Sequence, residues 1–259
     1  MTMDEKIQWP EAKYWTKTWN PVIGCVPTCS PACENCYAAA MANRFGIPFS
    51  PHDGRRYNPP RNGVVFCGNM TDLFGEFVDQ ADSEDFVRRS LGFSDKATYM
   101  WLTKRPANML AVLNGGQAIP ADDHDALLSF RDFEFGNQYF GFTAETQDWY
   151  DERMRIWKGN KPEWANGWLS AEPILGPIDL RLGDVPNDEV PFKWVVVGCE
   201  SGPKRRKSSP EWIADIVDQC FVAGVKVFVK QVCLSDGKFT NKIDEFPEHL
   251  QIRQVPWEN

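Results

Sequence analysis

The sequence feature that most restricts the possible folds is a repeated alternation of short β-rich runs with amphipathic stretches. Strands are predicted at residues 63–70, 98–103, 139–143, 167–171, 194–198 and 225–229, preceded by a candidate first strand at 20–24. Helices are predicted at residues 34–45, 83–91, 107–113, 147–157 and 210–223. Strands that alternate with helices pair in parallel through right-handed crossovers. The pattern therefore predicts an α/β fold, either an open doubly wound sheet or a full or partial barrel.

The length and charge of the chain limit its class further. Its 259 residues suit one barrel-sized domain, so we expect a single domain over 1–259 with an N-terminal extension (1–18) and a C-terminal tail (about 234–259). The net charge of −8 argues against a protein that coats duplex DNA, because such binding needs a basic face. A nucleotide or a flipped base in a pocket is compatible with this charge. The one basic cluster is either a solvated loop or a phosphate contact, and it consists of Lys204, Arg205, Arg206 and Lys207.

No segment predicts a membrane span or a secretory signal. The longest apolar runs, such as residues 194–197, are far too short to cross a bilayer. The N-terminus carries acidic residues and no apolar stretch typical of a signal peptide. We therefore expect a soluble, cytoplasmic protein with no membrane partner.

Polar residues follow five of the predicted strands directly at their carboxyl ends. They are Gly68 and Asn69; Thr103, Lys104 and Arg105; Thr143 and Glu145; Ser170 and Glu172; and Cys199, Glu200 and Ser201. In parallel α/β folds the carboxyl ends of the strands meet at one rim, where binding sites form. Each group alone is also what a solvated loop carries, but their recurrence predicts the rim of one pocket.

The cysteines carry the strongest chemical signal. Of the eight in the chain, four lie close together, at Cys25, Cys29, Cys33 and Cys36. A secreted disulfide scaffold would be shorter and would carry a signal peptide, so the clustered thiols indicate a metal or an iron–sulfur cluster. The other four lie in apolar segments and are expected to be small core residues, and they are Cys67, Cys199, Cys220 and Cys233.

Two ligand spacings are present in the cysteine cluster, Cys29-x3-Cys33-x2-Cys36 and Cys25-x7-Cys33-x2-Cys36. Thiolates suit both iron–sulfur clusters and zinc. Structural zinc usually needs a second cysteine or histidine pair, and neither a second cysteine pair nor a histidine with ligand spacing lies nearby. Three thiolates on one loop leave one iron of a [4Fe–4S] cluster open to another molecule.

The spacing Cys29-x3-Cys33-x2-Cys36 after a candidate first strand resembles the radical S-adenosylmethionine enzymes. The resemblance implies a partial (β/α)6 TIM-like barrel with parallel strands and a [4Fe–4S] cluster whose open iron chelates the methionine moiety of S-adenosylmethionine. It also implies cleavage of S-adenosylmethionine to a 5′-deoxyadenosyl radical, with electrons from a reductant such as flavodoxin or ferredoxin. The superfamily usually has an aromatic residue before the last cysteine. This chain has Asn35 there, and its aromatic residue, Tyr37, follows Cys36.

A closer resemblance covers nearly the whole chain. The segments WNPVIGC, CENCYA, VFCGNMTDLF, WLTKRP, SAEPILGPID, WVVVGCESGP and AGVKVFVKQ are similar to a phage-associated family of radical-S-adenosylmethionine-like proteins of uncharacterised function. The family pattern implies Cys25, Cys33 and Cys36 as ligands, whereas the superfamily spacing implies Cys29, Cys33 and Cys36. We take Cys29 as the third ligand, because three residues is the commonest loop length. The fourth thiol, Cys25, is then a reserve ligand or a structural residue, and a phage origin would place the protein in the host cytoplasm.

The resemblance also implies roles for the residues of the rim. The segment Gly68–Asn69–Met70 occupies the place where the superfamily binds the methionine amino group. The full set of predicted cofactor-binding residues is Gly68, Asn69, Met70, Thr103, Arg105, Ser170 and Glu172. The predicted catalytic residues are Lys104, Glu145 and Glu200. A salt bridge in the core is the competing interpretation for the charged members.

The substrate follows only from context. Phage genomes carry radical enzymes that hypermodify DNA, so the resemblance implies a modified nucleobase or nucleotide, for example the rearrangement of an amino-acid-decorated thymine. Two alternatives stay open. One is a radical DNA-lesion repair lyase resembling spore photoproduct lyase, and the other is a non-catalytic, zinc-stabilised binding module that uses the four clustered cysteines.

Overall fold

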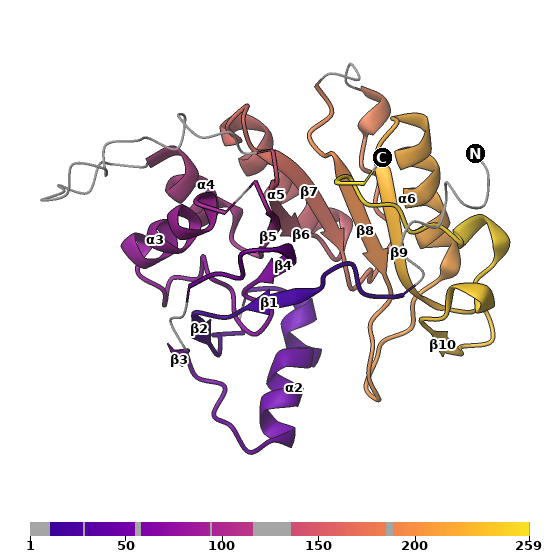
Figure 1. The fold of residues 1–259 in the computed structure, drawn as a ribbon. Helices are drawn as coiled ribbons and strands as arrows, with labels where there is room; N and C mark the ends of the chain where they lie inside the picture. The colour runs from indigo at the N-terminus through magenta and orange to yellow at the C-terminus, as the bar shows by residue number, and fades with distance from the viewer. Residues whose placement is uncertain are drawn as a thin grey trace, which may run out of the picture.

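A single eight-stranded sheet forms the centre of the molecule (Figure 1). The structure is a computed structural model that describes residues 11–27, 29–54, 58–93, 95–115, 136–184 and 189–258. Along the sheet the strands are β1 (Lys17–Trp19), β4 (Gly63–Cys67), β5 (Ala97–Thr103), β6 (Gln138–Thr143), β7 (Asn166–Ala171), β8 (Trp194–Gly198), β9 (Lys226–Cys233) and β10 (Phe239–Thr240). All neighbours pair in parallel except β9 and β10, which are antiparallel. The predicted α/β fold with a parallel sheet is thus confirmed.

Both faces of the sheet are buried, which explains why its strands are nearly continuous apolar runs. Successive side chains of a strand point to opposite faces. In β8, Val195 and Val197 belong to one buried cluster, and Trp194 and Val196 belong to a second. The strands of the sheet therefore separate two cores.

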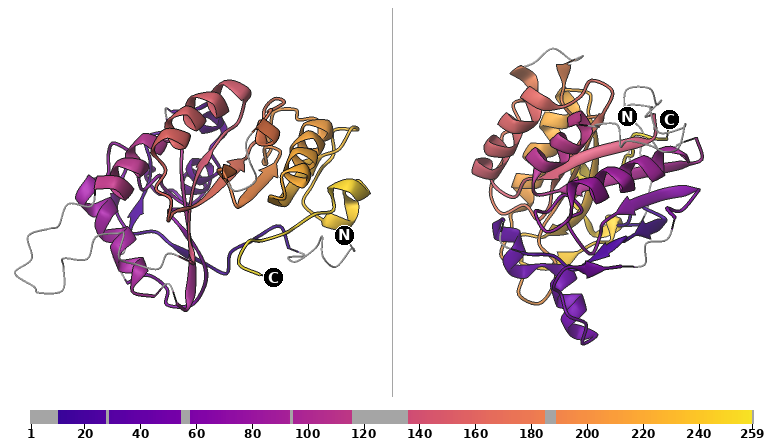
Figure 2. Two further views of the ribbon diagram at one scale, coloured as in Figure 1. Left: turned by 90° about the horizontal axis from the view of Figure 1, so that it is seen from above. Right: turned by 90° about the vertical axis from the view of Figure 1, so that its left-hand side faces the viewer.

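Among the described residues, four helices cover one face of the sheet, which we call the outer face (Figure 2). They are α3 (Gln80–Leu91), α4 (Pro106–Gly115), α5 (Gln147–Asn160) and α6 (Pro210–Val222). In α6 the buried residues Ile213, Ile216, Val217 and Cys220 recur at helical spacing and face the sheet. The apolar side of this amphipathic helix therefore packs against β8 and β9.

Aromatic side chains fill the inner face near the amino-terminal ends of the strands. The Tyr14 ring lies edge-on to Trp194, with ring centres 4.9 Å apart, and to Phe228, at 5.1 Å. Val255 is fully buried in the same cluster, and Trp257 packs against it. The segments before β1 and near the C-terminus thus close this end of the inner face.

Within the described residues, the sheet is not closed by strand pairing. β1 pairs with β4, and β9 pairs with β8 and β10. Trp15, just before β1, reaches towards β9, where the Lys230 Nζ lies 5.6 Å from the centre of its ring. Among these residues, β1 and β9 are therefore linked by side-chain packing and not by strand pairing.

The predicted first strand at residues 20–24 is wrong. The strand that joins the sheet is β1 (Lys17–Trp19), whose Trp19 is buried in the outer core. Pro21 follows, and because proline has no N–H it cannot continue the ladder. Residues of β2 (Val22–Ile23) instead pair with β3 (His52–Asp53) in a separate antiparallel sheet.

The helix predicted at residues 34–45 is interrupted. Pro31–Asn35 form the short 3₁₀ helix η1, and the α-helix α2 runs over Tyr37–Arg44. Between them Cys36 has φ −58° and ψ 119°, which is outside the helical range. Cys33 therefore lies in η1, and Cys36 lies at the bend between η1 and α2.

The C-terminal segment belongs to the fold. Short 3₁₀ turns at Leu182–Asp184, Ile243–Glu245 and Glu248–Leu250 punctuate the later connections. Val229 N–H donates to Ile252 O at 2.8 Å, and Gln254 N–H donates to Val227 O at 2.9 Å, so this segment covers the edge of β9. Among the described residues, no helix is long and apolar enough to cross a membrane.

Candidate functional site

The four clustered cysteines lie in one segment, residues 24–36, which we call the cysteine loop; residue 28 is outside the described residues. The loop connects β2 to α2 and passes over the carboxyl ends of the central strands. Cys25, Cys29, Cys33 and Cys36 are all half-buried free thiols. The clustered cysteines are thus partly accessible and not joined in disulfides.

Two of the sulfurs are in contact. Cys29 Sγ and Cys33 Sγ are 3.9 Å apart, and Ser30 Oγ lies 3.7 Å from Cys33 Sγ. The hydrogen bond from Cys29, together with the Lys104 ammonium and Ser30, holds the pKa of Cys33 below that of an ordinary thiol, although burial opposes the shift. The same hydrogen bond raises the pKa of Cys29, so Cys33 is the thiolate of the pair.

Glu145 anchors the cysteine loop to β5 and β6. Its fully buried carboxylate accepts hydrogen bonds from Ser30 Oγ at 2.7 Å and from Arg153 Nη1 at 2.9 Å, and it forms an ion pair with Lys104. Arg153 also donates to Cys29 O at 3.4 Å. Burial alone would raise the pKa of Glu145, but Lys104, Arg153 and Ser30 outweigh it and hold the pKa below its ordinary value.

Glu200 anchors the loop to β8. Its carboxylate accepts hydrogen bonds from Asn35 Nδ2 at 3.1 Å and from Arg206 Nε at 3.0 Å. Arg206 also donates through Nη2 to Pro31 O at 3.1 Å. Burial raises the pKa of Glu200, yet Arg206 and Asn35 outweigh it and keep the group ionised. The 3₁₀ helix η1, which carries Cys33, is thus tied to the end of β8.

A third buried carboxylate, Asp72, holds the beginning of the loop through an arginine. Asp72 accepts hydrogen bonds from Thr103 Oγ1 at 2.8 Å and from Arg105 Nη1 at 3.2 Å. Arg105 then donates through Nη2 to Val26 O at 3.2 Å, and its Nε contacts Glu76 at 2.5 Å. Thr103 and Arg105 were both predicted to bind cofactor. In the structure, the hydroxyl of Thr103 and the guanidinium of Arg105 donate to protein groups, and Arg105 contacts the cysteine loop.

The predicted segment Gly68–Asn69–Met70 lies against the first residues of the loop. Asn20 Nδ2 donates to Asn69 Oδ1 at 2.7 Å, and Met70 N–H donates to Asn20 Oδ1 at 3.1 Å. Gly24 N–H in turn donates to Met70 O at 3.2 Å. Gly68 has φ +73°, a conformation that favours glycine and turns the chain at the end of β4.

Ser170 and Glu172 lie at the end of β7. Trp168 belongs to the inner core and Leu169 to the outer core, so the strand alternation directs Ser170 to the inner face. Glu172 pairs with Lys230 Nζ at 2.6 Å and accepts a hydrogen bond from Gln231 Nε2 at 3.1 Å. Glu172, directly after β7, thus contacts β9.

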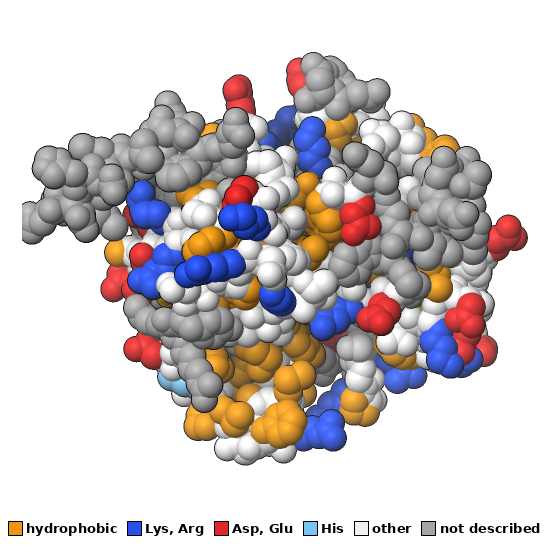
Figure 3. Space-filling model, in the orientation of Figure 1, with side chains coloured by type: hydrophobic (Ala, Val, Ile, Leu, Met, Phe, Trp, Pro, Cys, Tyr) orange, Lys and Arg blue, Asp and Glu red, His pale blue; other side chains and the backbone are white. Residues whose placement is uncertain are grey.

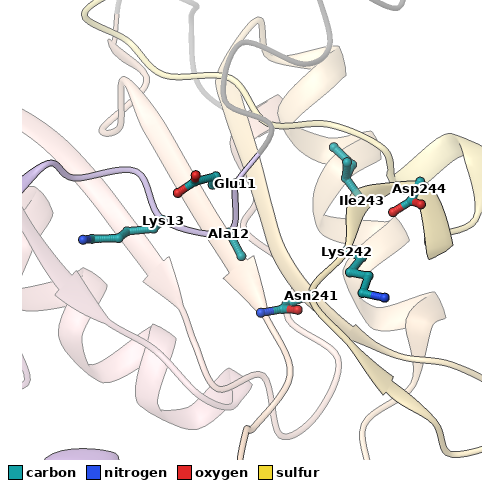
Figure 4. A pocket seen from close by; sticks show the side chains of 7 residues that line it. All are labelled: Glu11, Ala12, Lys13, Asn241, Lys242, Ile243 and Asp244. Atoms are coloured by element: carbon teal, nitrogen blue, oxygen red, sulfur yellow. The ribbon is translucent and has the colours of Figure 1, made fainter.

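A pocket of about 510 Å³ lies elsewhere, between the first described residues and the segment after β10 (Figure 4). Its charged side chains include Glu11, Lys13, Lys242 and Asp244, so both signs are present. None of the predicted site residues lines it. The cysteine loop with its three anchoring carboxylates is therefore the better candidate site.

The comparisons place the chain in a family. A family model described as "Protein of unknown function (DUF5131)" matches residues 5–245. The chain belongs to the DUF5131 family. The matched range contains the cysteine loop, every strand of the sheet and all three anchoring carboxylates. No curated protein and no solved structure matches this DUF5131 chain, so its function has to be inferred from the site.

The donor set of the DUF5131 loop suits a soft metal centre. Four half-buried thiols on one anchored segment are the ligand type of iron–sulfur clusters and of zinc. Among the described residues, no three His, Cys, Asp or Glu side chains are arranged to hold one metal ion. A cubane cluster differs in that each thiolate binds its own iron, so its ligands need not surround one point. The residues present thus fit a cluster by donor type.

Sequence reasoning missed the partners that fix the site of this DUF5131 chain. Asp72, Ser30 and Arg153 were not predicted, and Arg206 was read only as part of a basic run. Arg153 could have been found, because it lies between the buried Tyr150 and Trp157 on the apolar side of α5, where a charge needs a partner. No local signal marks Asp72, whose burial depends on strands that are distant in sequence.

Proposed function

We propose that this chain is a radical S-adenosylmethionine enzyme that holds a [4Fe–4S] cluster on Cys29, Cys33 and Cys36 and acts on a modified nucleobase or nucleotide. The observation that supports it is the anchoring of a four-cysteine loop to the carboxyl ends of parallel strands by three buried carboxylates, Asp72, Glu145 and Glu200. In parallel α/β folds, chemistry is built at that end. We further propose that the curved sheet corresponds to the partial (β/α)6 barrel of these enzymes.

When bound, the cluster would supply the electron that cleaves S-adenosylmethionine to a 5′-deoxyadenosyl radical. The protein's own residues contribute position and charge. The three anchors restrict the loop before any cofactor arrives, which lowers the entropic cost of gathering the thiolates. Lys104 places a positive charge beside Cys33 and favours its thiolate form, the form that binds metal.

The inner face supplies further polar groups for the proposed cofactor and substrate. Lys104 and Lys230 are each partly exposed while paired with Glu145 and Glu172, and we propose that their ammonium groups also contact a bound carboxylate or phosphate. We assign Ser170, Glu172 and the segment from Gly68 to Met70 to cofactor binding because they surround the same strand ends. We propose Lys104 as the catalytic residue. Glu145 and Glu200, the other two residues predicted as catalytic, would be positioning residues that hold the cysteine loop.

Anaerobic reconstitution with iron and sulfide tests the proposal. We expect a brown protein with close to four irons and four sulfides per chain, and formation of 5′-deoxyadenosine when reductant and S-adenosylmethionine are added. Cys33→Ala and Cys36→Ala should lose the iron, because each removes one of three thiolates. Cys220→Ala, which removes a fully buried core thiol on α6, is the matched control and should keep it. A wild-type protein that binds no iron or sulfide would refute the proposal.

The third ligand is decided by comparing two variants. If Cys29 is the ligand, Cys29→Ala should lose iron and Cys25→Ala should retain it, and the reverse holds if the family pattern applies. Iron content per chain after removal of excess reagent is the measurement. Full iron content in both variants would contradict the three-ligand arrangement.

One distance favours a second candidate, the zinc-stabilised binding module. Two thiolates on a tetrahedral zinc ion with bonds of about 2.3 Å lie about 3.8 Å apart, and Cys29 Sγ and Cys33 Sγ are 3.9 Å apart. Metal analysis of the protein purified without oxygen distinguishes the two. A colourless protein with one zinc per chain, and no iron after reconstitution, would favour the module.

A further inference from the structure

Helix α2 (Tyr37–Arg44) and the residue after it expose an apolar stripe directly beside the cysteine loop. Tyr37, Met41 and Phe45 follow one another at four-residue spacing and are 51%, 44% and 67% exposed. An adjacent side of the helix packs inward through Ala38 and Ala42. Figure 3 shows the hydrophobic side chains gathered at the lower edge of the molecule, where α2 lies in Figure 1. Contiguous exposed apolar side chains mark interaction surfaces.

The stripe begins at the candidate site. Tyr37 follows Cys36, and its hydroxyl donates a hydrogen bond to Asn69 O, at the turn after β4. From there Met41 and Phe45 lead away from the strand ends along α2. A ligand on the stripe would therefore have one end at the cysteine loop.

A basic segment, residues 204–207, borders the start of the stripe. Asn35 Nδ2, in the 3₁₀ helix before α2, donates to Lys204 O at 3.2 Å. Lys204, Arg205 and Lys207 are exposed there. The chain as a whole carries a charge of −8, so this local concentration of cations favours an anionic ligand at one place.

We propose that the α2 stripe and the basic segment together bind single-stranded nucleic acid and direct it to the cysteine loop. Exposed aromatic rings stack with unpaired bases, and neighbouring cations contact the phosphates. A duplex keeps its bases paired and cannot use the stripe. The inference rests on the proposed function for the reaction of the bound strand, whereas the binding itself needs no cluster.

Fluorescence anisotropy with a labelled single strand of about 12 nucleotides, a length within the usual site sizes, tests the binding on metal-free protein. Phe45→Ala should weaken binding about 5-fold or more, because stacking of one base contributes at least that much. Phe221→Ala on α6 is the matched control, since Phe221 is 68% exposed but lies on the helix that covers the far side of β8 and β9. It should leave the affinity unchanged.

The salt dependence tests the basic segment separately. Each phosphate of a single strand that a cation neutralises adds about 0.7 to the slope of log affinity against log salt. The double variant Lys204→Ala, Lys207→Ala removes two cations and should therefore reduce this slope by about 1.4. The double variant Lys158→Ala, Lys193→Ala removes two other exposed lysines and should keep the wild-type slope.

Three results would overturn the inference: a duplex of the same sequence binding as tightly as the single strand, displacement of the strand by polyglutamate of equal charge, or equal affinities of Phe45→Ala and Phe221→Ala. Equal displacement by polyglutamate would indicate an acidic protein as the natural partner. Because cleavage of S-adenosylmethionine is measured without nucleic acid and binding without the cluster, failure of one does not imply failure of the other.

Discussion

At the scale of single residues, the site follows a common rule: each buried carboxylate that reaches the cysteine loop has an arginine partner. The pairs are Asp72 with Arg105, Glu145 with Arg153, and Glu200 with Arg206. A buried carboxylate without a partner would be costly, because its charge loses hydration. In all three pairs the arginine also donates to a backbone carbonyl of the loop, so charge pairing and loop anchoring use the same side chain.

Glu145→Gln tests this rule with little change in shape. The variant leaves Lys104 and Arg153 facing a neutral amide, so we expect the free energy of unfolding to fall by about 3–5 kcal/mol at neutral pH. Urea denaturation measures it, and Glu152→Gln on the exposed side of α5 should change it by less than about 0.5 kcal/mol. Similar losses in the two variants would contradict the role of Glu145.

The pH dependence of stability gives an independent check on Glu145. Its pKa is lower in the folded chain than in the unfolded chain, so its contribution is complete above about pH 4.3, the ordinary value for Glu. The contribution is lost as the pH falls through the folded pKa. The stability difference between wild type and Glu145→Gln should therefore shrink as the pH is lowered below about 4. A difference that stayed constant or grew on acidification would be inconsistent with an ionised Glu145.

At the scale of elements, close approach between neighbouring strands limits which residues fit. Gly141 in β6 pairs with Trp168 in β7, and a Cβ at Gly141 would lie 2.4 Å from Trp168 O. Gly159, near the end of α5, has nothing within 4 Å of such a Cβ. A side chain at Gly141 would thus clash with β7, whereas Gly159 has room for one.

Alanine substitutions at these two glycines should change stability in opposite directions. Gly141→Ala forces β6 and β7 apart and should lower the free energy of unfolding by about 1–3 kcal/mol or more. Gly159→Ala improves helix propensity and should raise it by up to about 1 kcal/mol. Thermal unfolding of both variants is the measurement, and a stabilising Gly141→Ala would show that the strands can separate freely.

The sequence predicted the later strands well because each is a continuous apolar run buried on both faces. The first strand was misplaced, since a three-residue strand such as β1 has no periodicity to read and its pairing with β4 is decided over 48 residues. The rim carboxylates Glu145, Glu172 and Glu200 were predicted from their position after strands. The hydrogen-bond partners of these carboxylates were not predicted, because they are distant in sequence. Ser30 and Glu145, for example, are 115 residues apart, and only the folded sheet brings them together.

At the scale of the whole molecule, the two ends of the chain complete the inner core. Tyr14 contacts rings from β4, β7, β8 and β9, and Val255 joins the same cluster from the other end of the chain. The sheet is therefore held in its curved form by packing of the terminal segments against its inner face.

Tyr14→Ala tests the contribution of this packing. Removing a fully buried ring should cost about 3–5 kcal/mol of unfolding free energy. Tyr14→Phe keeps the packing of the ring and should stay within about 1.5 kcal/mol of wild type. Chemical denaturation measures the free energy of unfolding of both variants. Equal losses of this free energy would mean that the hydroxyl of Tyr14, and not its ring, makes the contribution.

The distance in sequence between the cysteine loop and its anchors has a consequence for biosynthesis. Translation delivers the N-terminal residues first, so all four clustered thiols leave the ribosome while Glu145 and Glu200 have yet to be made. Arg206, which donates a hydrogen bond to Pro31 O, is translated 175 residues after Pro31. Until then the nascent thiols lack these contacts and are open to oxidants, and the loop can be fully anchored only once the chain has been translated past Arg206.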